Sequence, residues 1–247
     1  MFDEGLPALQ SLIPLRGNPV VELIGVTERG MMNAKITVSS EGGHSSIAKW
    51  KHNPIHVLHS ALDFIQSHSV VHSTSLPAID MFKLLVLPAW ARENQAFNTL
   101  YDFIGIPNLL GILFHRLIPF AAPNLSTSYA VTQFFAGKLD LVNVIPDNTT
   151  ALINIRVHPA DSCQSIKEYL SSKLQEFSIT YPSSFSFKLE FPGLQYEPAP
   201  ITPYRENERK SEYYHKLKDI LYKTHRHHSP NSDVLVGPGV MVGGTVS

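Results

Sequence analysis

The sequence predicts an α+β protein built around a ferredoxin-like βαββαβ domain with a helical insertion. Apolar and polar residues alternate in four stretches, as is typical of half-buried strands: 32–38, 128–135, 151–157 and 185–190. Two stretches carry apolar residues at helical spacing: 58–65 and 166–177. Their order along the chain is strand, helix, strand, strand, helix, strand, which is the split βαβ arrangement.

Each helix of this domain has one apolar face. The first helix follows a polar loop at 41–46 and presents Leu58, Ala61, Leu62 and Ile65. The second presents Ile166, Leu170, Leu174 and Phe177. We expect Asp161 or Ser165 to cap the second helix, because Ser165 with Glu168 fits a capping box.

The remaining segments do not fit the alternating pattern. Residues 75–124 are apolar and contain several prolines, which favours a helical insertion rather than a membrane span. At the ends, we expect a loop and a strand within 12–26, a linker at 198–203 and a charged helix at about 206–225. The core face of that helix would be Tyr214, Leu217, Ile220 and Leu221. Two short buried strands are expected at Val234–Val236 and Val240–Val242.

Composition excludes some classes of protein. The chain has 247 residues, is 43% hydrophobic and 17% charged, and has a formal net charge of -1. A near-neutral chain lacks the basic surface of a nucleic-acid binder, so we expect no nucleic-acid partner. A single cysteine, Cys163, excludes an internal disulfide framework but does not fix the compartment, which stays unknown. Met1 is followed by Asp3, Glu4 and Gly5 with no apolar run, so we expect no signal peptide.

Three short motifs carry the chemistry: GGHSS at 42–46, NVIP at 143–146 and NIRV at 154–157. His44 lies on a polar loop between a strand and a helix. Arg156 shares the polar face of its strand with Asn154. A histidine N–H is suited to an oxyanion, and an arginine fork is suited to a carboxylate.

With these motifs, the chain resembles metallopeptidase family 20, the zinc amidohydrolases that include aminoacylase and carboxypeptidase S. The likeness runs from Asp3-Glu4-Gly5, through IGVTERG and the three motifs, to MVGGT near the end. It implies an α/β catalytic domain with two zinc ions and a ferredoxin-like lid that forms a homodimer. The lid would be residues 27–192, with its insertion at about 75–124. Residues 1–26 and 193–247 would be partial pieces of the α/β zinc-hydrolase catalytic domain, the second piece truncated.

The resemblance also implies roles for single residues. Glu4 would be a metal ligand, and His44 would reach a neighbouring subunit's active site and bind the developing oxyanion. Asn143 and Arg156 would hold the substrate's carboxylate. A substrate-facing turn would be formed by Gly243, Gly244 and Thr245. The substrate would be an N-acyl amino acid or a short peptide. The apolar insertion favours either a hydrophobic acyl group or contact of the insertion with lipid.

Each role has a simpler alternative. Glu4 could be a solvated acid, and His44 a loop histidine held by Ser45 or Ser46. Arg156 could pair with a surface acid, and Asn143 could satisfy its own turn.

The chain also departs from the family pattern. The upstream His-x-Asp and Asp-Glu-Glu motifs and the late histidine ligand are absent from this sequence, and Val246 follows Thr245 where an aspartate is usual. A two-zinc site needs several such ligands. We therefore expect a fragment with an incomplete zinc site that is inactive by itself. The alternative is a non-catalytic dimerisation or carboxylate-binding module.

Overall fold

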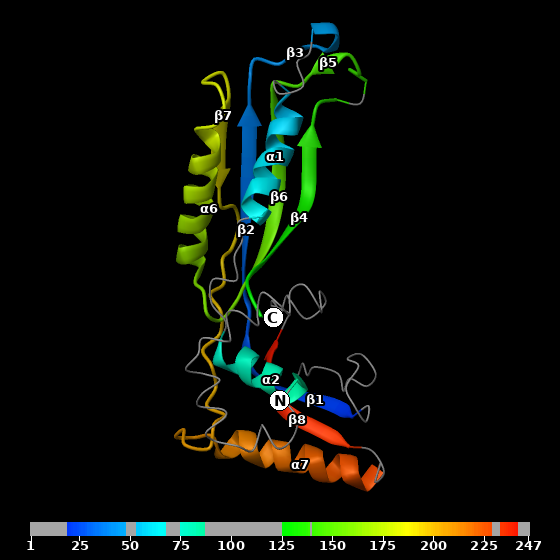
Figure 1. The fold of residues 1–247 in the computed structure, drawn as a ribbon, viewed down its shortest axis with the longest axis vertical. Helices are drawn as coiled ribbons and strands as arrows, with labels where there is room; N and C mark the ends of the chain where they lie inside the picture. The colour runs from blue at the N-terminus through cyan, green and yellow to red at the C-terminus, as the bar shows by residue number, and fades with distance from the viewer. Residues whose placement is uncertain are drawn as a thin grey trace.

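The structure is a computed structural model that describes residues 19–47, 53–67, 75–86, 125–138, 140–228 and 233–241 (Figure 1). Two groups of elements make up most of these residues. One is a four-stranded sheet covered by two helices. The other is a two-stranded sheet, with further helices, formed by segments near the two ends of the chain.

The larger sheet has the order β4-β6-β2-β7, and every neighbouring pair is antiparallel. Its strands are β2 (Gly30–Ser39), β4 (Ser128–Ala136), β6 (Asn148–Val157) and β7 (Ser186–Glu190). With α1 (Pro54–Ser67) after β2 and α6 (Cys163–Ser178) after β6, the order is βαββαβ. The predicted ferredoxin-like fold class is confirmed, and we call these six elements the lid.

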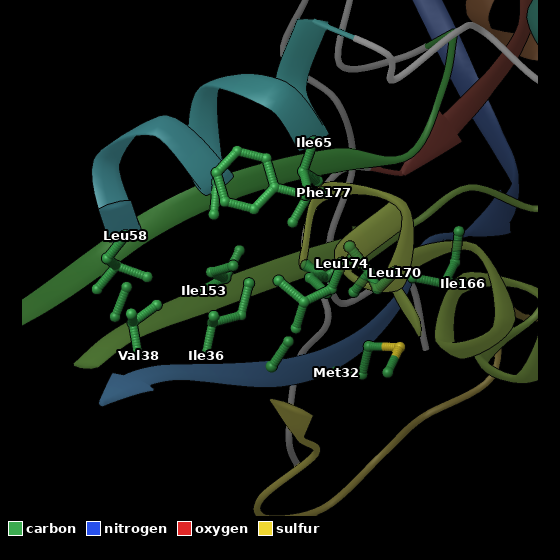
Figure 2. Close-up of a cluster of buried hydrophobic side chains, with 14 of the residues drawn as sticks. Met32, Ile36, Val38, Leu58, Ile65, Ile153, Ile166, Leu170, Leu174 and Phe177 are labelled. Carbon is green, nitrogen blue, oxygen red and sulfur yellow. The ribbon is translucent and has the colours of Figure 1, made fainter. Parts of the chain in front are cut away.

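Strict alternation along the central strands builds the lid core. In β2 every second residue is buried, including Met32, Ile36 and Val38, each with 0% exposure. These side chains meet the apolar faces of α1 and α6, where Leu58 and Leu170 are also fully buried (Figure 2). Burying one such side chain stabilises the fold by about 1.5–3 kcal/mol. The opposite face of the sheet carries no helix of the lid, and its side chains from β2 and β6 include Asn33, Lys35, Asn154 and Arg156.

The smaller sheet pairs two segments from opposite ends of the chain. β1 (Val20–Glu28) and β8 (Val234–Met241) run parallel, and α7 (Glu212–His228) packs on both strands. The sequence predicted two short strands where the structure has the single strand β8. Its Gly-Pro-Gly centre broke the apolar pattern but stays in register with Ile24 and its neighbours of β1.

The helix predicted to begin near residue 206 begins at Glu212. Residues 205–211 form bends and turns instead. The Glu208 carboxylate holds them, because it accepts hydrogen bonds from the backbone N–H groups of Tyr204 at 2.7 Å and Arg205 at 3.0 Å. The expected core face is also narrower than the apolar pattern suggested. Tyr214 is 7% exposed, whereas Ile220 is 50% exposed.

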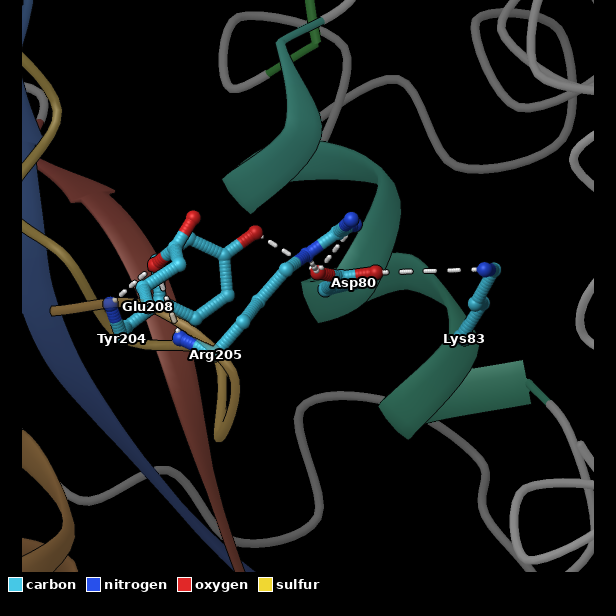
Figure 3. A network of polar contacts seen from close by, with 5 residues as sticks. All are labelled: Asp80, Lys83, Tyr204, Arg205 and Glu208. Atoms are coloured by element: carbon cyan, nitrogen blue, oxygen red, sulfur yellow. Dashed lines mark hydrogen bonds and ion pairs between the residues drawn. The ribbon is translucent and has the colours of Figure 1, made fainter. Parts of the chain in front are cut away.

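Helix α2 (Leu76–Val86) lies in the range predicted to be the insertion and packs against β8 and β1. Its Asp80 carboxylate accepts hydrogen bonds from the Tyr204 hydroxyl at 2.6 Å and from Arg205 Nε at 3.0 Å (Figure 3). Burial and this carboxylate raise the pKa of the Tyr204 phenol. The polar contact therefore ties α2 to the chain leaving the lid. Residues 87–124 lie outside the described part, and the domain boundaries stay a prediction.

Candidate functional site

Two of the predicted motifs meet at one end of the lid. β3 (Gly43–His44) pairs antiparallel with β5 (Val144–Ile145), and the Ser45 N–H donates to the Asn143 carbonyl at 2.9 Å. This two-strand junction lies beyond the end of β2, far from the smaller sheet (Figure 1). We call residues 41–47 and 140–147 the lid tip.

Gly42 is required for this junction. It has a φ of +67°, which side chains rarely adopt, and a Cβ there would lie 2.9 Å from the Ile145 carbonyl oxygen. The GGHSS loop can thus turn closely against the NVIP strand. An open depression of about 410 Å³ lies beside the turn, and its lining includes Gly42, Gly43, Lys138, Leu141, Val144 and Asp147.

The side chains of His44 and Asn143 contact each other across the lid tip. His44 Nε2 lies 3.2 Å from the Asn143 amide nitrogen, and His44 Nδ1 lies 2.8 Å from Ser46 Oγ. Both of these contacts are exposed to solvent. The structure thus brings together two of the predicted site residues, and it also contains the contact between His44 and Ser46 that the simpler alternative required.

Arg156 lies at the opposite end of the lid. It is opposite Met31 of β2 and Ser128 of β4, and it lies on the face of the sheet that the lid helices leave open. Its Nη1 atom is buried and has no hydrogen-bond partner. Among the strand residues on this face of the described sheet, the one acid is Glu190, which pairs with Lys35 at 3.2 Å and Lys188 at 2.8 Å. The expected alternative, a surface acid paired with Arg156, does not occur within the described residues.

A second arginine lies beside Arg156, and the sequence analysis missed it. Arg29 joins β1 to β2 and is 3% exposed. Its Nη2 atom donates to the Arg156 carbonyl at 2.7 Å and to Ser128 Oγ at 2.7 Å, and its backbone N–H donates to the Met241 carbonyl at 3.2 Å. Burial and the neighbouring Arg156 charge lower the pKa of Arg29 to about 10. The residue follows the IGVTE strand, but no sequence pattern indicated that its side chain would be buried.

The two ends of the lid are too far apart to bind one small molecule within a subunit. Ser39, at the end of β2 near the lid tip, pairs with Asn148, whereas Met31 pairs with Arg156. Eight residues of strand separate these two pairs, which corresponds to about 26 Å at about 3.3 Å per residue. The structure therefore separates Arg156 from His44 and Asn143.

The other predicted site residues, Glu4, Gly243, Gly244 and Thr245, lie outside the described residues. Within the described part of the chain, no group of three or more His, Cys, Asp or Glu side chains is placed to hold a metal ion. The helices of that same part include none with the length and apolar character needed to cross a bilayer.

Comparisons with known proteins agree with the fold. The family model described as the peptidase dimerisation domain of the M20 family matches residues 26–182, which include the whole lid tip and Arg156. The chain is 30% identical to an N-fatty-acyl-amino acid synthase/hydrolase from Xenopus tropicalis over 248 residues, covering 100% of this chain and 43% of that protein. It is 27% identical to a probable carboxypeptidase S-like protein from Dictyostelium discoideum, covering 99% of this chain and 42% of that protein.

Among solved structures, a metallo-carboxypeptidase of the M20 family from Sulfolobus solfataricus aligns with a TM-score of 0.47 and 17% identity, covering 94% of this chain and 56% of that one. The chain thus spans less than half the length of the curated relatives named above. Because the family model covers more than half of the sequence, including five of the six lid elements, the chain belongs to the M20 family of peptidases and related amidohydrolases.

Proposed function

We propose that the whole protein is a zinc-dependent amidohydrolase that cleaves the amide bond of N-acyl amino acids or short peptides next to a free carboxylate. The lid described above would supply groups that bind the substrate and stabilise the transition state. The observation that carries the proposal is the pairing of His44 with Asn143 on an exposed tip, beyond the end of a rigid sheet. The names of the relatives support the reaction class, and the fatty-acyl substrate in one of them agrees with a hydrophobic acyl group.

His44 is suited to stabilise an oxyanion. It lies on a short strand fixed by β5 rather than on a free loop, and its ring is exposed to solvent and so can meet a substrate. A donor fixed in advance and directed at developing charge favours the transition state over the ground state. Asn143 lies within 3.2 Å of the same ring and would contact the same substrate.

Arg156 is suited to bind the substrate's carboxylate. The buried Nη1 atom has no partner, and the neighbouring charge from Arg29 is positive. A buried guanidinium nitrogen that has no acidic partner has lost its hydrogen bonds to water. Binding of an anion therefore lowers its free energy by forming a charge-assisted hydrogen bond. Charge on this part of the lid face therefore favours a carboxylate.

The separation of about 26 Å between the two ends requires two subunits. The lid tip of one protomer would reach the active site whose carboxylate is bound by Arg156 of the other. The two groups then meet one substrate without any large change inside the lid. This arrangement agrees with the dimerisation domain that the family model describes.

Strand β4 is the edge through which we propose that the homodimer forms. It is nine residues long, contains no charged residue, and exposes Val131 at 50%, Phe134 at 43% and Phe135 at 56%. The opposite edge, β7, has five residues and carries Lys188 and Glu190. Charged, short edges resist pairing with another chain, whereas a long apolar edge promotes it. Two β4 strands would continue the sheet across the dimer.

Zinc is part of the proposal, but the described residues do not fit it. A site for two zinc ions requires several His, Asp or Glu ligands, and the described part of the chain holds no group of three. Glu4, the one ligand that the resemblance implied, lies outside the described residues. We therefore assign no step to the metal, and the lid residues act on the substrate itself.

The test is hydrolysis of an N-acyl amino acid by the whole protein carrying His44→Ala. We expect kcat to fall by about 100-fold or more, as when one oxyanion donor is removed, while the dimer measured by light scattering is unchanged. The control is His59→Ala, which removes an exposed histidine of α1 that pairs only loosely with Asp63 at 3.6 Å. Full hydrolysis by the His44→Ala dimer would contradict the proposed role.

A second candidate is the non-catalytic dimerisation or carboxylate-binding module. The unpaired Arg156 and the apolar β4 edge support it equally, because neither needs a metal. Under this alternative the chain dimerises and binds N-acyl amino acids without hydrolysing them. A monomer at micromolar concentration would exclude it, and hydrolysis that depends on His44 would favour the enzyme.

A further inference from the structure

The His44 ring contacts three polar groups of the lid tip. Nδ1 lies 3.3 Å from the backbone nitrogen of Ser46, whose N–H donates to it, and 2.8 Å from Ser46 Oγ. Nε2 lies 3.2 Å from Nδ2 of the Asn143 side-chain amide. A neutral imidazole has one N–H donor and one acceptor nitrogen. The three partners therefore decide which nitrogen carries the proton.

Only one of these three partners has a fixed direction of hydrogen bonding. The Ser46 hydroxyl can donate or accept by rotation, and a half-turn of the Asn143 amide exchanges its oxygen and nitrogen. The backbone N–H of Ser46 can only donate. Since that N–H is directed at Nδ1, Nδ1 must be the acceptor, and the ring proton must lie on Nε2.

We propose that Ser46 is a positioning residue that holds His44 in the tautomer protonated at Nε2. Both the backbone N–H and the hydroxyl of Ser46 donate to Nδ1. A half-turn of the Asn143 amide replaces the nitrogen that faces Nε2 with Oδ1, which then accepts from the Nε2–H while no substrate is bound. This inference rests on the proposed function in that His44 is the oxyanion donor. It goes further because it assigns a role to a residue outside the predicted site and fixes the donor atom.

The tautomer of His44 decides whether the ring can donate a hydrogen bond to the oxyanion when substrate binds. If the two tautomers were equally populated, half of the His44 rings would direct a lone pair at the oxyanion and repel it. With Ser46 in place, the ring already carries its proton on Nε2, and no proton has to move between the ring nitrogens before this N–H exchanges Asn143 Oδ1 for the oxyanion. The Asn143 amide, with its oxygen turned to His44, directs its NH2 group away from the ring as a second donor.

The test is nuclear magnetic resonance of the 247-residue chain labelled with ¹⁵N-histidine, at a pH well above the ordinary histidine pKa of about 6.5. Long-range ¹H–¹⁵N correlation shows which ring nitrogen is protonated, and the His44 signals are assigned from their loss in His44→Gln. We expect the proton on Nε2. A ring protonated at Nδ1 overturns the proposal.

Substitutions at Ser46 and at its neighbour Ser45 test whether the Ser46 hydroxyl sets the tautomer ratio of His44. In Ser46→Ala the hydroxyl donor is lost, so the ratio of the Nε2–H to the Nδ1–H tautomer should fall about threefold, in keeping with one exposed hydrogen bond. Ser46→Thr should restore the ratio, and Ser45→Ala, one residue away, should leave it unchanged. An unchanged ratio in Ser46→Ala overturns the role of Ser46.

Asn143→Asp tests the other side of the ring. A carboxylate can only accept, so the Nε2–H tautomer should persist and strengthen if Asn143 presents its oxygen. A shift of the proton to Nδ1 overturns the proposal. None of these measurements uses hydrolysis. If the proton is on Nε2 but His44→Ala retains full activity, the proposed function fails while the tautomer assignment stands.

Discussion

At the scale of single residues, the lid separates two arginines from two lysines. Lys35 and Lys188 share Glu190, whereas Arg156 Nη1 and Nε of its buried neighbour Arg29 have no hydrogen-bond partner. A positive charge that is already held in place and unneutralised is ready for an anionic ligand. Paired cations on the same sheet provide a control of the same charge.

Removal of the Arg156 guanidinium should therefore weaken the binding of substrates that carry a carboxylate. For Arg156→Met we expect kcat/KM of the whole protein to fall about 10- to 100-fold, the range for a hydrogen bond to a charged group. Arg156→Lys should recover only part of this loss, since lysine lacks the bidentate fork. When the carboxylate of the substrate is converted to an amide, the unsubstituted whole protein and its Arg156→Met variant should hydrolyse it equally.

The control for this experiment is Lys188→Met, which removes a cation that already pairs with Glu190. We expect kcat/KM to change less than twofold, because exposed ion pairs contribute little. An equal loss in Lys188→Met and Arg156→Met would show that overall charge, and not the Arg156 site, attracts the substrate.

Sequence reasoning singled out His44, Asn143 and Arg156 because each belongs to a short motif with a characteristic flanking pattern. Arg29 was missed for a physical reason. Its side chain is buried by contacts to Ser126, Ser128 and Arg156, about a hundred residues away along the chain. Local periodicity carries no information on such contacts, and an arginine after a strand is ordinarily solvated.

At the scale of elements, α6 shows which parts of a helix a local sequence pattern can predict. The predicted helix is present, but its cap is Ser162, which accepts from the Ser165 N–H while the Ser165 hydroxyl completes the capping box. The predicted partner, Glu168, instead accepts from Gln164 Nε2 at 2.7 Å. A serine can take the role that glutamate usually has in this motif, so the pattern predicted the helix start but not the capping pair.

Loss of this cap should lower the stability of the lid. We expect Ser162→Ala to reduce the free energy of unfolding by about 1 kcal/mol, measured by urea denaturation. Ser171→Ala is the matched control, because Ser171 is an exposed residue in the middle of the same helix. There alanine should be neutral or slightly stabilising, given its higher helix propensity. Equal losses in the two variants would contradict the capping role.

Dimerisation through strand β4 can be tested by adding a charge to this edge. A charge in the middle of the apolar edge should prevent strand pairing, so Phe134→Lys should convert the dimer to a monomer in light scattering at micromolar concentration. Ser186→Lys on the opposite edge, β7, should leave the dimer intact. A Phe134→Lys chain that remains dimeric would show that the subunits meet elsewhere.

At the scale of the whole molecule, the lid could be predicted and the pairing of the chain ends could not. The two lid helices and the strands β2, β6 and β7 have a regular apolar period, whereas that of β4 is interrupted by a register shift between Val131 and Gln133. The order of these elements along the chain was enough to predict the fold. The parallel pair β1 and β8 joins residues near the two ends of the chain, with Val20 opposite Val234. Only tertiary packing creates that pair. Its Gly237-Pro238-Gly239 centre also conceals the continuity of β8.

In the proposed dimer, the lid tip of one subunit acts in the active site of the other, while Arg156 acts in the active site of its own subunit. The two ends of the lid are about 26 Å apart, so a small substrate cannot contact both ends of the same protomer. A dimer whose subunits carry different defects can therefore contain one intact active site. A protein with both groups in one subunit cannot.

The most direct measurement mixes inactive variants of the whole protein. Subunits carrying His44→Ala and Arg156→Met are combined by unfolding and refolding, and hydrolysis of an N-acyl amino acid is measured. Random pairing makes half of the dimers mixed, each with one intact site, so activity should recover to about a quarter of the original. No recovery beyond the sum of the two variants, with mixed dimers verified by mass spectrometry, would contradict the claim.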